Sequence, residues 1–225
     1  MLSVIIPCRN DAEFLRRLVP DLVNDPRLEV IVVGADDSDI ATTQVCKTFG
    51  VRHIVRKGSR GLRLRAGAEI AQTQYLWFLH ADASITPDAV DAVIDSLKGG
   101  AAGGYFKFRF AGPESIQKKV TEICIAGRCR FGGIPYGDQA LFVGKLEYMA
   151  SGGHEILPLF EEVKLVRWLQ RSGRFQRLAL TVGVNPARWD KDGYALRSFK
   201  NRCLAIGKIL GIAPDRLARY YYTHR

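Results

Sequence analysis

Polar clusters that could bind a metal ion and phosphate stand at three places in the first half of the chain, at residues 9–11, 36–39 and 80–82. In the last cluster His80 and Asp82 are two residues apart, so in an extended segment both side chains face the same side. A carboxylate in that position suits a hard divalent cation that also binds diphosphate oxygens. On these residues alone, Asp82 could instead cap the following helix, and His80 could be an ordinary surface residue.

The elements that would position these clusters alternate between apolar strands and amphipathic helices. Strands are predicted at residues 2–7, 29–33, 51–55 and 75–79, and helices after Asn10 or Asp11, at 40–49, at 61–71 and from Pro87. This alternation predicts a parallel sheet with right-handed crossovers, in which ligands bind beyond the carboxyl ends of the strands. Each cluster follows such a strand, so the sequence predicts that the three clusters converge on one site.

The alternation weakens after Gly99. Residues 104–110 alternate as a half-buried antiparallel strand does, residues 140–143 form a further strand, and helices are predicted at 115–130, 162–170 and 195–210. The sequence has no internal repeat, low-complexity tract or clear linker. Residues 1–225 are therefore expected to form a single domain.

The composition is that of an ordinary globular protein, with 47% hydrophobic and 25% charged residues. Five scattered cysteines without a C-x-x-C pair argue against a disulfide framework and a thiolate zinc site, and they favour a reducing compartment. The first residues do not have the pattern of a signal peptide, and no apolar run approaches the roughly 20 residues that span a bilayer. We therefore expect a cytoplasmic protein, either free or peripheral at the inner face of a membrane.

The net charge of +10 is concentrated towards the C-terminus. Residues 163–225 contain 14 Lys or Arg and 3 Asp or Glu, and subtracting these from the totals of 33 and 23 leaves 19 basic and 20 acidic residues in 1–162. Such asymmetry favours an anionic partner for the C-terminal segment: phosphate, an anionic lipid surface or nucleic acid.

One side of the helix predicted at 195–210 is apolar. The residues that share this side are Phe199, Cys203, Ile206 and Leu210. Packing of this side onto the rest of the domain is the expected use of the pattern. The alternative is docking on an anionic membrane that carries a lipid-linked acceptor.

A series of motifs runs through nearly the whole chain in a fixed order. They are SVIIPCRND, EVIVV followed by acids and Ser, RGLRLRAGA, YLWFLHADA, GGYFKFRF, YGDQALFV, PLFEEVKLVRWLQRSG and ARW. Through these motifs the chain resembles family 2 glycosyltransferases of the GT-A fold, and in particular a bacterial subgroup of short soluble members. The resemblance implies a Rossmann-like α/β fold, with a mostly parallel sheet, helices on both faces and a C-terminal helical, basic extension. Residues 1–100 would then be the nucleotide-sugar-binding half and 101–225 the acceptor half.

The resemblance also assigns roles on the donor side. Asp82 would bind Mn²⁺ or Mg²⁺, and His80, at the first acid of the D-x-D motif of the family, would contact the metal or the ribose. The residues implied in donor binding are Pro7, Asn10, Asp36, Asp37, Arg60, Arg63, Arg65, His80, Arg188 and Trp189. Asp36 or Asp37 is included because Gly34 stands where the family has an Asp. Guanidinium groups at a helix N-terminus suit a diphosphate ligand. The arginines could instead be solvated surface charge, and Arg188-Trp189 could be a structural pair.

On the acceptor side, Glu162 matches the catalytic base of the family, Glu161 is its acidic neighbour, and Asp138 would order the acceptor loop. Two carboxylates at a helix start could equally complement the helix dipole.

The implied reaction is metal-dependent transfer of a sugar from a nucleotide diphosphate sugar to an acceptor hydroxyl, with inversion. A sugar-phosphate nucleotidylyltransferase is an alternative, but residues 3–10 lack a Gly-rich basic loop. The other alternative is a non-catalytic protein that binds nucleic acid or a membrane surface. The net charge allows a nucleic-acid-binding protein, but the sequence has no stacking motif or recognition helix that supports one. Nucleic acid is therefore not an expected partner.

Overall fold

The computed structural model describes residues 1–36 and 39–223, and within them one seven-stranded sheet has the strand order β3-β2-β1-β4-β6-β5-β7. The strands are β1 Leu2–Cys8, β2 Leu28–Gly34, β3 Arg52–Val55, β4 Tyr75–Phe78, β5 Gly103–Phe110, β6 Phe142–Gly144 and β7 Phe175–Val184. β1 pairs in parallel with β2 and β4, and β6 is antiparallel to both β4 and β5. The predicted mostly parallel sheet is therefore confirmed, and it contains strands from both predicted halves of the chain.

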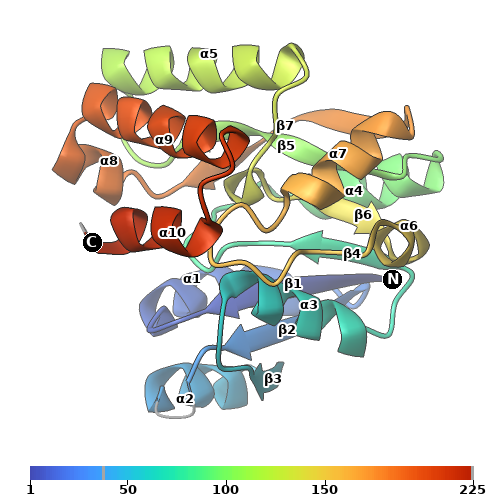
Figure 1. Ribbon diagram of the computed structural model, residues 1–225. Coiled ribbons are helices and arrows are strands. Elements are labelled where there is room, and N and C mark those ends of the chain that lie inside the picture. Colours follow the sequence, from blue (N-terminus) through green and yellow to red (C-terminus); the bar gives the residue numbers. More distant parts are fainter. Residues whose placement is uncertain (37–38, 224–225) are drawn as a thin grey trace.

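Helices cover both faces of this sheet (Figure 1). They are α1 Ala12–Val23, α2 Ile40–Thr48, α3 Arg60–Ile70, α4 Ala89–Lys98, α5 Ile116–Arg130, α6 Lys145–Ser151, α7 Val163–Arg171, α8 Ala187–Asp192, α9 Tyr194–Ile209 and α10 Pro214–Thr223, with a 3₁₀ turn, η1, at Gly137–Gln139. β1 is buried along its whole length because helices lie on both sides of it. The α/β fold with helices on both faces is thus the one that the alternating pattern predicted.

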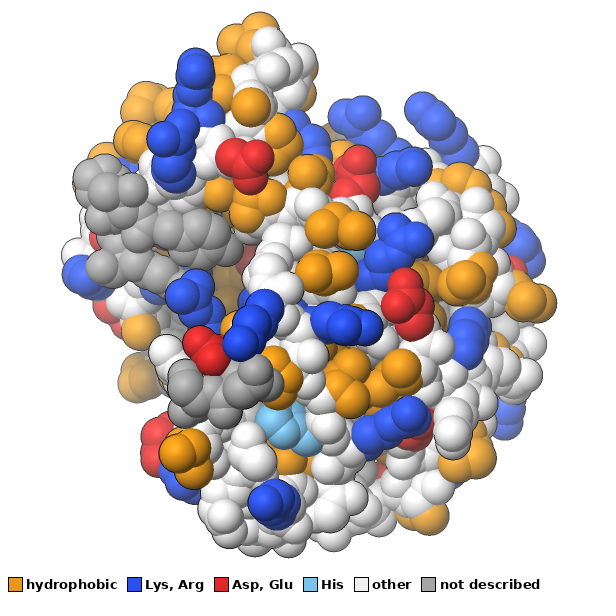
Figure 2. All heavy atoms as spheres, turned by 60° about the horizontal axis from the view of Figure 1, so that its bottom comes forward, with side chains coloured by type: hydrophobic (Ala, Val, Ile, Leu, Met, Phe, Trp, Pro, Cys, Tyr) orange, Lys and Arg blue, Asp and Glu red, His pale blue; other side chains and the backbone are white. Residues whose placement is uncertain are grey.

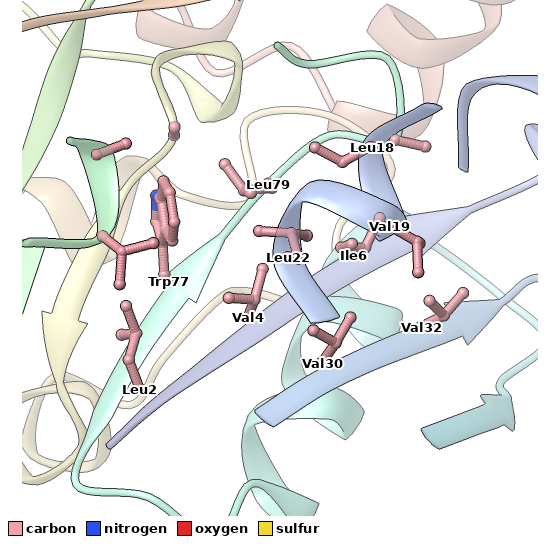
Figure 3. Packing of buried hydrophobic residues seen from close by; sticks show 14 of the residues in the cluster. Leu2, Val4, Ile6, Leu18, Val19, Leu22, Val30, Val32, Trp77 and Leu79 are labelled. Carbon is pink, nitrogen blue, oxygen red and sulfur yellow. The ribbon is translucent and has the colours of Figure 1, made fainter. Parts of the chain in front are cut away.

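The core has two layers because successive residues of a strand point to opposite faces. Figure 3 shows Val4 of β1 beside Leu22 of α1 and Ile6 beside Val19, while Leu2 lies next to Trp77 of β4. The other layer forms around β1 residue Ile5, with side chains from α3 and α7. The central strands are thereby fixed between two apolar layers, and their carboxyl ends form a rigid base for the loops that follow.

The C-terminal part of the fold differs from the sequence prediction in three respects. β5, expected as a half-buried antiparallel strand, is mostly buried and pairs in parallel with β7, although it is antiparallel to β6. β7 was not predicted, since as the half-exposed edge strand it lacks a continuous apolar run. The expected inward side of α9 is wrong, because Phe199, Ile206 and Leu210 are exposed. The inward side instead carries Leu204, which packs with Phe160, Val163 and Leu217, and Gly207, whose missing side chain leaves room for Leu217.

The described helices include none that has the length and hydropathy of a membrane-spanning segment. All five cysteines are free, as their spacing predicted.

Candidate functional site

His80, Asp82 and Asp138 line one small pocket beyond the carboxyl end of β4. The first two come from the segment after the strand, and Asp138 comes from η1, more than fifty residues further along the chain. Gly137 makes this approach possible, because a Cβ atom there would lie 3.1 Å from Nε2 of His80. Figure 2 shows the surface hollowed at its left side, the side on which the carboxyl ends of the central strands lie in Figure 1. The structure therefore brings together the residues of the H-x-D and G-D motifs.

Arg60 connects this pocket to the acidic pair. It is the first residue of α3, whose N-cap Ser59 accepts a hydrogen bond from the amide of Leu62 at 3.2 Å. Nη1 of Arg60 lies 2.9 Å from Nε2 of His80, and its Nε donates to the carboxylate of Glu161. A guanidinium group can only donate, so Nε2 of His80 accepts and the ring proton lies on Nδ1. Burial, followed by the charges of Arg60 and Arg188, lowers the pKa of His80 well below its ordinary value, and the ring is neutral at pH 7.

The two glutamates have different surroundings although they are adjacent. Both are buried, at 0% exposure for Glu161 and 3% for Glu162. Glu161 is paired with Arg60, whereas Oε1 of Glu162 accepts only the amide of Gly137, at 3.3 Å. No hydrogen-bond partner for Oε2 of Glu162 is present among the described residues. Burial, together with the charge of Glu161, raises the pKa of Glu162 to about 8, so this carboxylate is a stronger base than an exposed one.

Backbone strain marks three of the predicted motifs. Among the described residues that are not glycine, only Asn10, Ala140 and Phe160 have positive φ, at 59°, 50° and 64°. Each lies within two residues of a predicted site residue or is one itself, and for a residue as large as Phe160 this conformation is an outlier. Nζ of Lys208 in α9 donates to the carbonyl oxygen of Phe160 at 3.1 Å. Lys208 of α9 thus supports the strained residue Phe160, which precedes Glu161. No sequence pattern indicated this contact.

The remaining arginines of the motifs are distributed unevenly around the site. Arg63 is buried and donates to the carbonyl oxygen of Gly58 at 2.9 Å, near the end of β1. Arg65 lies on the surface, 3.3 Å from Glu69, so its expected contact with the donor diphosphate has no support in this arrangement. Arg188 lies close enough for its charge to lower the pKa of His80, and it donates to the hydroxyl of Tyr221 at 3.1 Å.

Trp189 belongs to an aromatic cluster. Its ring packs edge-on against Phe110, at 5.3 Å between ring centroids, and is tilted against the ring of Tyr194 at 5.9 Å. Trp189 thus packs within an aromatic cluster, and the cation–π contacts of the described residues do not include the stacking of Arg188 on Trp189 that the sequence offered as a structural alternative. Any contact of Trp189 with a donor stays a prediction.

The nucleotide end of the site is formed by the segments after β1 and β2. Pro7 is buried in β1, and the amide of Asn10 donates to Oδ2 of Asp39 at 3.0 Å, so these two segments are connected. Asp36 is exposed, and Asp37 lies outside the described residues.

His53 occupies the space beside Gly34 that an Asp would need. A Cβ atom at Gly34 would lie 3.0 Å from Nε2 of His53. This buried nitrogen has no hydrogen-bond partner among the described residues. No sequence pattern connects these two residues, which lie 19 positions apart on the neighbouring strands β2 and β3.

The acidic residues of the pocket fit a metal ion that is shared with a phosphate ligand. Within residues 1–36 and 39–223 no three His, Cys, Asp or Glu side chains are arranged to hold a metal ion by themselves. Burial raises the pKa of both Asp82 and Asp138; the charge of Asp11 adds to the rise for Asp82, and the charge of Asp82 adds to the rise for Asp138. Mg²⁺ commonly binds to one or two carboxylates and completes its shell with water and substrate phosphates. Asp82 and Asp138 supply such an incomplete donor set.

Gly61 allows α3 to approach the acidic pair, and this contact gives a testable prediction. An added Cβ would lie 1.9 Å from the carbonyl oxygen of Glu155 and 2.9 Å from Cβ of Glu161. Gly61→Ala should therefore lower the free energy of unfolding by about 1–3 kcal/mol in urea titrations. The matched control is Gly127→Ala in α5, where an added Cβ meets no atom within 4 Å; it should be neutral or stabilise by up to about 1 kcal/mol. Equal stability of the two variants would contradict the close packing of α3 on this loop.

Comparisons with known proteins agree with this geometry. The profile of the family described as Glycosyl transferase family 2 matches residues 3–143. Similar solved structures include TarS 1–349 of S. aureus in complex with UDP-GlcNAc, at TM-score 0.62 and 14% identity, covering 82% of this chain and 58% of that one. A mannosyltransferase of Pyrobaculum calidifontis in complex with GDP-Man and Mn²⁺ has TM-score 0.61 and 13% identity, over 80% and 56% of the two chains.

Glucosyl-3-phosphoglycerate synthase from Mycobacterium tuberculosis, in complex with UDP, is a further similar structure. Its TM-score is 0.56 at 16% identity, over 82% of this chain and 69% of that one. These similarities show the fold, and the chain spans about three fifths of the length of TarS 1–349. No curated protein sequence matches the chain significantly.

Proposed function

Since the chain belongs to glycosyl transferase family 2 and is a glycosyltransferase, we propose that it transfers a sugar from a nucleotide diphosphate sugar to an acceptor hydroxyl, with a divalent metal ion and with inversion. The observation that carries this proposal is the position of Arg60, which contacts His80 beside the predicted metal ligand and Glu161 beside the predicted base. One guanidinium group therefore lies between the place of the leaving diphosphate and the place of the attacking hydroxyl. Similar structures with UDP-GlcNAc, UDP or GDP-Man support a nucleotide-sugar donor.

The residues would divide the chemistry between them. Asp82, with Asp138 beside it, would hold the metal ion, whose charge stabilises the departing diphosphate. Arg60 and Arg188 add positive charge at the same place, where charge develops during transfer. Neutral His80 orients Arg60 through its Nε2 rather than binding the metal with that atom.

Glu162 would accept the proton of the acceptor hydroxyl. The hydroxyl oxygen forms the new bond to the anomeric carbon from the face opposite the diphosphate, and the bond from that carbon to the diphosphate oxygen breaks. The electron pair leaves with the diphosphate. The raised pKa of Glu162 suits this role, because a base whose pKa lies near the working pH transfers protons efficiently.

A panel of nucleotide sugars tests the proposal. The true donor should raise the melting temperature in the presence of Mn²⁺, by an amount that corresponds to about 2.7 kcal/mol at a hundredfold excess over Kd. The same compound with EDTA, and the free sugar with Mn²⁺, are the controls and should have little effect. Stabilisation by a nucleoside triphosphate together with a sugar phosphate, but by no nucleotide sugar, would favour the nucleotidylyltransferase instead.

A further inference from the structure

The helices α5 and α9 are apolar on the side that faces away from the protein. The large apolar residues on this side are Ile116, Val120 and Ile123 of α5, Leu196, Phe199 and Ile206 of α9, and Leu210 directly after α9. Each is between 51% and 82% exposed. In both helices their spacing of three, four and seven residues forms a continuous stripe along one side. We call these two stripes together the outer apolar face.

The inward sides of the same helices carry buried charged groups beside apolar residues such as Leu204. Lys118 of α5 is buried, and its Nζ donates to the carbonyl oxygens of Ala111 and Pro113 at 2.9 and 2.8 Å. Arg197 of α9 is buried and paired with Asp192 at 3.1 Å. These helices are thus oriented by the polar and apolar contacts of their inward sides, and not by their exposed apolar stripes. Their exposed stripes are therefore a fixed feature of the surface.

The two stripes belong to one region of the molecule. α5 and α9 are in contact, and Figure 1 shows them next to each other at the upper edge of the view. The last residue of α9, Ile209, and Ile212 in the connection after the helix are also exposed. Soluble proteins rarely expose so many large apolar side chains together unless they bind a partner.

The charge around the outer apolar face selects the kind of partner. α5, α9 and α10 together contain ten Lys or Arg and two acids, Glu122 and Asp215. Lys118, Arg197 and Lys208 make inward contacts, which leaves seven cations, among them the exposed Arg202, against the two acids. A second copy of this chain would place the same positive charge against it. An anionic bilayer offers both an apolar interior and negative headgroups, which attract cations beside an amphipathic helix.

From these observations we infer that α5 and α9 dock on an anionic membrane surface through the outer apolar face. The apolar side chains enter the boundary between headgroups and acyl chains, and the cations contact lipid phosphate. This binding is peripheral and needs no nucleotide sugar, so it does not depend on the donor assignment.

Docking would place the acidic pair close to the bilayer. The inward side of α9 packs on Phe160 through Leu204, and Lys208 holds the carbonyl oxygen of Phe160, which precedes Glu161. If the proposed function holds, an acceptor hydroxyl on a lipid-anchored molecule could reach Glu162 without leaving the membrane surface. The outer apolar face therefore favours an amphiphilic acceptor.

Flotation with vesicles tests the docking. The full-length protein should float with vesicles of phosphatidylglycerol and phosphatidylcholine at low salt, float less at high salt, and stay at the bottom with phosphatidylcholine alone. Each apolar side chain removed in the double variant Phe199→Ser/Ile206→Ser should lower the apparent lipid affinity by about tenfold. Removal of one cation by Arg202→Gln should lower it roughly fivefold.

Matched controls lie on the opposite side of the molecule. Ile40→Ser on α2 removes an equally exposed apolar residue, 76% exposed, and Arg17→Gln on α1 removes an exposed cation. Both should float like the wild type. Failure to float at low salt, or an equal loss in the controls, would overturn the inference. So would a concentration-dependent dimer in sedimentation that Phe199→Ser/Ile206→Ser abolishes, since the face would then bind a second copy.

Discussion

Glu162→Gln is expected to lower the rate of sugar transfer by about 10²–10⁴-fold while the affinity for the donor stays unchanged. Glutamine keeps the size of the side chain and can still accept a hydrogen bond from Gly137, as Oε1 of Glu162 does. It cannot take a proton from the acceptor hydroxyl. The measurement is kcat at saturating donor, with donor affinity from calorimetry.

The pH profile of the same variant separates a base from a structural role. Because burial and Glu161 raise the pKa of Glu162 to about 8, kcat/KM of the wild type should rise with pH and level off above about 8. The residual rate of Glu162→Gln should lack this rise. A variant whose rate is low but still rises with pH in the same way would contradict the assignment.

Stability should depend on pH with the opposite sign. The unfolded chain releases the proton of Glu162 near its ordinary pKa of 4.5, whereas the folded protein holds it until about pH 8. The contribution of this group to the free energy of unfolding is therefore fully present below pH 4.5 and is lost as the pH rises towards 8. Urea titrations across this range should show that Glu162→Gln removes this loss.

Glu161→Gln is the matched control, since it changes the neighbouring residue in the same way. It leaves Arg60 without its carboxylate partner, so we expect weaker donor positioning and a shift of the pH profile to lower pH, but not its loss. Near wild-type transfer by Glu162→Gln together with an inactive Glu161→Gln would reverse the two roles.

Asp82→Asn is expected to remove the metal dependence of donor binding. Even changes in the second shell of a metal site cost 10–100-fold in affinity, so loss of the predicted ligand itself should cost roughly 100-fold or more. Titration of the nucleotide sugar in Mn²⁺ and in EDTA should give the same weak affinity for the variant. His80→Ala should have a smaller effect, because it removes one contact of Arg60, which keeps its ion pair with Glu161, and removes no carboxylate.

The control for Asp82→Asn is Asp88→Asn, an exposed residue six positions later whose side chain makes no cap hydrogen bond to α4. It should bind the donor like the wild type. Unchanged, metal-dependent binding by Asp82→Asn would contradict its role as a ligand. If Asp138→Asn then lost the metal dependence, the ligand would be Asp138.

The first half of the fold was predictable because each buried strand is a continuous apolar run, which a parallel sheet covered on both faces requires. The meeting of His80 and Asp82 with other polar residues followed from the rule that ligands bind at the carboxyl ends of such strands. The orientation of α9 was not predictable from its apolar stripe, since Leu204, Gly207 and Lys208 hold its other side against the protein.

Contacts between distant residues were also beyond the sequence pattern. Arg60 and Glu161 are 101 positions apart, and their ion pair depends on the whole path of the chain between them. The approach of His53 to Gly34 and the positive φ of Phe160 likewise result from tertiary packing.

The position of β6 limits how this protein can be divided or recombined. β6 lies between β4 and β5, and it pairs with β4 through Tyr75–Gly144, Leu76–Val143 and Trp77–Phe142. A fragment that ends near residue 100 would leave β4 as an open edge that carries the buried Trp77, and such edges promote aggregation. Chimaeras that exchange the acceptor half between related enzymes must therefore preserve the β4–β6 pairing, and a cut at the middle of the sequence is not a modular boundary.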